Sequence, residues 1–170
     1  MKQRIVDLSY PIHEGMSTYP VPWHPVVEVT QLARHGIENR ASRKVLVGTH
    51  TGTHMDAPLH FFPGGPTIDQ IPLELLIGPA RLVDFSHAEP KQEISVTDFK
   101  RALRRERPTR LVMRFDWSRF WGTMNYYLTQ PFISEEAGQW LIDRGVRLLG
   151  MDTAQADSPD NGRNCPKDSP

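Results

Sequence analysis

Between residues 80 and 151, strand-like segments alternate with helix-like segments, and this order restricts the fold more than any other feature of the sequence. The apolar runs at 80–85, 110–115 and 147–151 are typical of buried strands. Amphipathic segments separate them, and a chain that runs strand, helix, strand usually pairs its strands in parallel. We therefore predict a parallel sheet with helices in this half of the chain.

Local signals define the ends of the two helices. Ser95 predicts the N-cap of the first, with Asp98 three residues later, and the helical pattern continues to about Arg107. Ser134 predicts the N-cap of the second helix, and Gly145 fits just past its end. The aromatic residues between these helices predict packing in the core or at an interface.

The first half of the chain has a different pattern. Segments 4–9 and 25–32 alternate apolar and polar residues, and 45–47 is also strand-like, which favours antiparallel pairing. A short helical piece is predicted over 72–77. The whole chain is predicted to be a mixed α/β protein, with one domain over 1–154 and a polar, poorly ordered tail over 155–170.

Charge and hydropathy exclude several classes of function. Twenty Lys and Arg residues balance twenty Asp and Glu residues, so no net field attracts nucleic acid or an anionic membrane. The basic run at 100–107 lacks interleaved aromatic residues and predicts a solvated helix surface. No apolar run reaches the roughly 18 residues of a membrane helix, the N-terminus has no signal-peptide pattern, and Cys165 is the only cysteine. These observations predict a cytoplasmic protein that binds neither nucleic acid nor membranes.

One segment concentrates metal-ligand side chains. Residues 49–61 read THTGTHMDAPLHF, and Gly52 and Pro58 make a helix there unfavourable. An irregular loop can bring His50, His54 and Asp56 to one point, where two imidazoles and a carboxylate would hold a divalent cation. We predict Zn²⁺ as the ion, with Mn²⁺ as the alternative. Hydrogen bonding within a polar loop is the competing explanation for these side chains.

Other side chains have less specific patterns. His60 is predicted to be the acid/base group, although it could also be a further ligand. Trp23 is a candidate wall of the substrate pocket or, equally, a rim or interface residue. The neighbouring His24 is interpreted as an ordinary loop residue, with a pocket donor as the alternative. Asp152 and Asp157 follow a predicted strand, where both functional carboxylates and turn residues are common.

The sequence GTHTGTHMDAPLHF resembles the signature of the cyclase or kynurenine formamidase-like family of metal-dependent hydrolases. The stretches VDLSYPIHEGMSTYP, PGGPTIDQIPLELLIGPARLVDFS and RLLGMDTAQADSPD are similar too, so the resemblance covers most of the chain. It implies a single-domain swivelling β/β/α fold with a mixed sheet. It also implies a homo-oligomer, either dimer or tetramer, whose substrate is a small-molecule amide.

The resemblance also implies roles for individual residues. His50, His54 and Asp56 match the metal ligands, with Asp56 bridging to a second metal, and His60 matches the acid/base. A metal-bound hydroxide would attack an arylformamide or cyclic amide carbonyl while His60 protonates the departing amine.

The sequence departs from the family pattern at its C-terminal end. A further histidine and a glutamate are expected after the segment 157–160, but no histidine follows His87. The C-terminal part of the family domain is therefore expected to be missing. This departure leaves an alternative function, a truncated and catalytically impaired family member that acts as a structural or small-ligand-binding oligomer.

Overall fold

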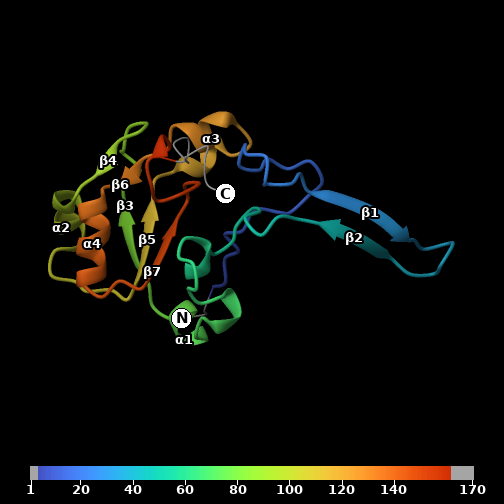
Figure 1. The fold of residues 1–170 in the computed structure, drawn as a ribbon, viewed down its shortest axis with the longest axis horizontal. Helices are drawn as coiled ribbons and strands as arrows, with labels where there is room; N and C mark the ends of the chain where they lie inside the picture. Colours follow the sequence, from blue (N-terminus) through green and yellow to red (C-terminus); the bar gives the residue numbers. More distant parts are fainter. Residues whose placement is uncertain (1–3, 162–170) are drawn as a thin grey trace. The chain divides into compact units, whose positions relative to one another are not determined.

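The computed structural model describes residues 4–161 and confirms a mixed α/β protein (Figure 1). The chain forms two compact units, and the boundary between them lies between Gln70 and Ile71. The predicted domain boundary at 154 stays a prediction, since the tail lies partly outside the described residues, as does Cys165. No helix in the described part is long and apolar enough to cross a membrane.

The first unit contains one β-hairpin. Strands β1 (Glu28–Ala33) and β2 (Ser42–Leu46) pair antiparallel, with a register irregularity between Gln31 and Ala33. The predicted antiparallel pairing is thus confirmed. The predicted strand over 4–9 is wrong: this exposed segment pairs with no strand in residues 4–161, and alternation alone cannot satisfy backbone hydrogen bonds. Two 3-10 turns complete the unit, η1 (Pro58–His60) and η2 (Ile68–Gln70).

The second unit is built on a parallel sheet. Strands β3 (Arg81–Asp84), β5 (Arg110–Arg114) and β7 (Leu148–Met151) lie in the order β3-β5-β7, all parallel, which confirms the predicted topology. Figure 1 shows α2 and α4 together beside this sheet. The other elements of the unit are α1 (Leu73–Leu76), β4 (Glu93–Ile94), α2 (Val96–Leu103), η3 (Trp117–Phe120), α3 (Met124–Leu128), β6 (Phe132–Ile133) and α4 (Glu135–Asp143).

The core of the second unit lies between the sheet and its helices. Phe99 and Leu103 on α2 are fully buried, and Phe99 contacts Phe85 edge to face with ring centroids 5.2 Å apart. Phe85 also stacks on Phe115, which directly follows β5. The predicted aromatic packing is confirmed, because the side chains of Trp117, Tyr126 and Tyr127 are buried.

Helix α2 begins as predicted and ends earlier. Ser95 accepts a hydrogen bond from the backbone of Asp98 while Asp98 accepts one from the Ser95 backbone, which is a complete capping box. The helix stops at Leu103 instead of about Arg107, because Arg104 takes a positive φ of 52° that α-helical geometry does not allow. Ser134 caps α4 as predicted, since its hydroxyl oxygen accepts a hydrogen bond from the backbone N–H of Ala137.

We expect Ser95→Ala to lower the free energy of unfolding by about 1 kcal/mol, the usual value of an N-cap hydroxyl. Its hydrogen bonds with Asp98 hold the pKa of that carboxyl below its usual range. A depressed pKa stabilises the fold above the unfolded value and loses this effect as the pH falls through the folded pKa. Urea unfolding at pH 7 and pH 3 measures both effects. If Ser95→Ala lowers the free energy of unfolding equally at both pH values, the coupling between the Ser95 hydroxyl and the pKa of Asp98 is contradicted.

Candidate metal centre

The loop that carries the histidines is held by its own unit. Thr51 is buried, and Thr53 accepts a hydrogen bond from the backbone of Tyr10. Gly52 has a φ of +63°, and a Cβ there would lie 3.4 Å from Met16, so the loop needs glycine at this point. The segment 50–56 contains no helix, and Ala57 is extended before Pro58, both as predicted.

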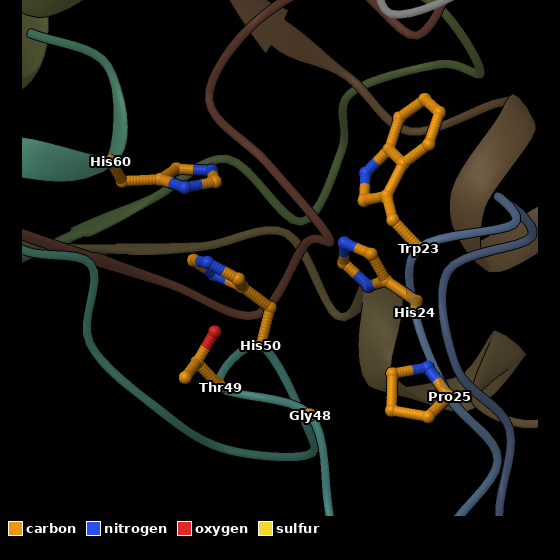
Figure 2. A pocket seen from close by; sticks show the side chains of 7 residues that line it. All are labelled: Trp23, His24, Pro25, Gly48, Thr49, His50 and His60. Atoms are coloured by element: carbon orange, nitrogen blue, oxygen red, sulfur yellow. The ribbon is translucent and has the colours of Figure 1, made fainter. Parts of the chain in front are cut away.

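A second close approach brings another segment to the loop. A Cβ on Gly48 would lie 2.9 Å from the ring of Pro25, so only glycine lets these two segments pack this tightly. The contact places Trp23 and His24 beside His50, as Figure 2 shows for the pocket lining. The site is therefore assembled from two segments that are distant in sequence.

Asp56 lies at the centre of the histidine cluster. Its Oδ1 atom is 2.7 Å from Nδ1 of His50 and 3.2 Å from Nε2 of His54. These two imidazole nitrogens are 3.2 Å apart. His60 completes the group, since one ligand atom each from His50, Asp56 and His60 lie within 4.8 Å of one another. The four side chains predicted from sequence thus form one cluster, in which His54 and His60 each approach both His50 and Asp56.

Hydrogen bonds within the cluster set its protonation. The bond between His54 and Asp56 raises the pKa of His54 and lowers that of Asp56. Burial lowers the pKa of His60, and the neighbouring His50 lowers it further. His54 Nδ1 lies 2.9 Å from the carbonyl oxygen of Gly52, an orientation that directs Nε2 to the centre of the cluster. Because only a neutral imidazole nitrogen coordinates a metal, the raised pKa of His54 opposes cation binding as the pH falls.

The donor set fits a divalent cation. Imidazole nitrogens with one carboxylate are the ligands that Zn²⁺ uses in catalytic sites, and Mn²⁺ also accepts them. The side chains of His50, His54 and Asp56 are 21%, 31% and 40% exposed, so water and a small molecule can reach the cluster. These observations support a metal centre that has open positions.

A pocket of about 250 Å³ adjoins the cluster (Figure 2). The rings of His50 and His60 lie against each other on one side, with centroids 3.9 Å apart and planes tilted by 40°. Trp23 and His24 come from the other segment, and the His24 ring stacks on that of His50 with centroids 5.7 Å apart. The pocket is therefore bounded by aromatic and imidazole rings, next to the candidate ligands.

The structure decides between two interpretations of His24. Its side chain lines the pocket, whereas the sequence favoured an ordinary loop residue over a pocket donor. Burial lowers the pKa of His24, and its neighbour His50 contributes to that shift. No local signal could have revealed this position, because it depends on the approach of Gly48 to Pro25. Trp23 lines the same pocket and is 67% exposed.

Known proteins resemble this chain over most of its length. Residues 6–158 match the sequence model of the Cyclase family, described as "Putative cyclase". A kynurenine formamidase of Bacillus cytotoxicus is 30% identical over 158 residues, which span 92% of this chain and 71% of that protein.

Solved structures have the same fold. A structure described as a potential metal-dependent hydrolase with cyclase activity is 28% identical and superimposes with a TM-score of 0.68 over 89% of this chain and 69% of its own. Isatin hydrolase A from Labrenzia aggregata is 24% identical, and its TM-score of 0.80 over 92% of this chain and 70% of its own shows the shared fold. The chain belongs to the Cyclase family, the kynurenine formamidase-like family of metal-dependent hydrolases.

Proposed function

We propose that this chain hydrolyses a small amide, either an N-formyl arylamine or a cyclic amide, with a divalent cation held by His50, His54 and Asp56. The convergence of these side chains and His60 beside an open pocket carries the proposal. A cation bound there lowers the pKa of water and polarises a carbonyl group. The names of the similar proteins, kynurenine formamidase and isatin hydrolase, support these two substrate classes. Zn²⁺ is the ion we propose, and Mn²⁺ is the alternative.

We propose that His60 is the acid/base of the reaction. It ends η1, on the far side of the pocket from Trp23, and its ring contacts those of His50 and Phe61. Its lowered pKa favours the neutral imidazole, which can accept a proton from water and pass it to the departing amine. Trp23 offers a flat apolar wall on which an aromatic substrate can lie.

The test is turnover of N-formylkynurenine and isatin by the zinc-loaded chain. We expect at least one of them to be hydrolysed. His60→Gln should lower kcat by about 10²- to 10⁴-fold, the usual contribution of a general acid/base, while metal content is retained. His35→Gln, in the exposed hairpin turn, is the matched control and should leave kcat unchanged.

Two results would contradict the assignment. If a fully metal-loaded chain hydrolyses neither substrate, the amide hydrolase proposal fails for these substrates, and a binding role for the pocket is favoured. If His60→Gln loses the metal as well as activity, His60 is a ligand instead of the acid/base.

We also propose that the chain forms a homo-oligomer through the β1–β2 hairpin. In the described part of the chain these strands pair only with each other, and an isolated two-stranded hairpin is marginally stable. Six apolar side chains around it are more than one third exposed: Val26, Leu32, Ile37, Val45, Leu46 and Val47. Glu28 and Lys44 lie two positions apart in the register, so a twofold arrangement can match the charges of two copies.

Light scattering tests this interface. We expect the wild-type chain to be a dimer or tetramer and Leu32→Lys to reduce its mass, because the lysine would place a charge in the buried contact. Ile142→Lys on α4 is the control, since Ile142 is similarly exposed outside the hairpin. An unchanged mass for Leu32→Lys would contradict the proposed interface. The cytoplasmic location stays a prediction from composition.

A further inference from the structure

A second cavity, of about 420 Å³, lies in the second unit and shares no residue with the metal pocket. Its lining comes from the segments that lead into two neighbouring parallel strands, β3 and β5. The polar side chains in this lining are Arg81, Glu106, Thr109 and Arg110. Nothing in the proposed hydrolase chemistry uses these residues.

Each strand of the parallel sheet has an arginine at its beginning. Arg81 and Arg110 are the first residues of β3 and β5, and Arg147 directly precedes β7. Because neighbouring strands are parallel and Arg110 pairs with Leu148, the three arginines lie at the same end of the sheet, where its strands begin. This end of the sheet therefore has an arginine at the beginning of each of its three strands.

Further cations surround this cavity. Arg144 donates a hydrogen bond of 2.9 Å to the backbone oxygen of Glu106, and the backbone of Arg147 donates one of 2.8 Å to Thr109. Both arginines are thereby tied to lining residues. The segment 100–110 contains six Lys or Arg residues and one carboxylate, although the whole chain has a net charge of zero. The segment that supplies part of the cavity lining is therefore rich in positive charge.

The arginines in the lining have different roles. Arg110 is fixed, because it donates to the backbone oxygens of Leu75 and Glu74, and a Cβ on Gly78 would lie 2.7 Å from its Nη1 atom. Arg81 donates at 2.9 Å to the carboxylate of Glu106, and both side chains are well exposed. An exposed ion pair of this kind contributes little stability and exchanges readily. The carboxylate of Glu106 thus holds the guanidinium group of Arg81 in the position where an anionic ligand would otherwise bind.

One carboxylate does not balance this charge. Arg105, Arg107 and Arg147 are exposed, and within residues 4–161 no carboxylate pairs with them. A ligand with more than one negative charge would compensate them better than a second carboxylate. Arginine binds phosphate oxygens through paired N–H donors. The lining has no aromatic side chain on which a base could stack, which favours a small ligand over single-stranded nucleic acid.

We propose that this cavity, lined by Arg81 and Arg110, binds a small phosphate-bearing anion, with Arg147 next to the lining residue Thr109. Arg81 binds the anion once Glu106 releases it, and Arg147 adds a second exposed guanidinium. Arg110 is the fixed floor of the site.

Calorimetric titration of the full chain with inorganic pyrophosphate tests the proposal. Arg81→Gln and Arg147→Gln should each weaken binding about tenfold, because each removes a charge-assisted contact. Glu106→Gln should tighten binding about tenfold, because the competing carboxylate is lost. Arg43→Gln, an exposed arginine on β2 outside this unit, should have no effect. Binding should weaken as salt is added.

Three results would overturn the proposal: no binding of pyrophosphate below about 1 mM, unchanged affinity in Glu106→Gln, or an oligonucleotide that binds more tightly with increasing length. The last would assign this end of the sheet to nucleic acid. The readout needs neither metal nor turnover, so it is independent of the proposed hydrolase function.

Discussion

Replacing Asp56 by asparagine should reduce the affinity for a divalent cation by at least about 100-fold, more than the loss of a typical supporting hydrogen bond around a metal. Among residues 4–161, Asp56 is the only carboxylate in the cluster, and its Oδ1 atom is the common neighbour of His50 and His54. Asparagine keeps the volume of the side chain but removes the negative charge that offsets the cation. Its amide group is also a weaker ligand.

Turnover should fall with metal content. The variant should recover little activity at saturating zinc, because an ion held without Asp56 is not oriented toward the pocket. Metal content per chain, measured by elemental analysis after dialysis, separates this effect from unfolding when circular dichroism is recorded on the same samples.

His13→Ala is the matched control for this experiment. His13 lies in the same unit and is exposed, and its ring lies 2.9 Å from the backbone oxygen of Glu14. It should keep the wild-type metal content and turnover. Full metal content in Asp56→Asn would show that Asp56 does not hold the ion, and would favour hydrogen bonding within the loop as the role of its carboxylate.

The predictable part of the site is local in sequence. His50, His54, Asp56 and His60 lie within eleven residues, so ligand type, spacing and the breakers Gly52 and Pro58 were sufficient to predict their convergence. The pocket wall is not local, since His24 reaches His50 only through the tight packing of two distant segments. No spacing rule describes such a contact.

In the fold too, elements with local sequence signals were predictable, and elements that depend on distant contacts were not. Segments with both an apolar period and a cap, such as α2 and α4, were predicted at their first residues, because Ser95 and Ser134 act on the backbone next to them. Residues 4–9 have a strand-like period but no partner strand in the described part of the chain. The two-residue strands β4 and β6 have no period at all, and only their mutual pairing defines them.

Asp152 had two interpretations from sequence, and its contacts favour a structural one. Its carboxylate accepts hydrogen bonds from the backbone N–H groups of Phe115 at 2.7 Å and Trp117 at 2.9 Å. Asp116 lies between them and has a positive φ of 55°, which is unfavourable for a residue other than glycine. The carboxylate thus holds the chain on both sides of a strained residue at the end of β5.

We therefore expect Asp152→Ala to lower the free energy of unfolding by about 2–4 kcal/mol, because two backbone N–H groups beside buried aromatic residues lose their acceptor. Asp152→Asn should cost about half as much, since one acceptor oxygen remains. Asp157→Ala is the matched control, an exposed aspartate on the same loop, and should change stability by less than about 0.5 kcal/mol. Urea unfolding at pH 7 measures all three. Equal stability of Asp152→Ala and Asp157→Ala would contradict the structural role and return Asp152 to the candidates for function.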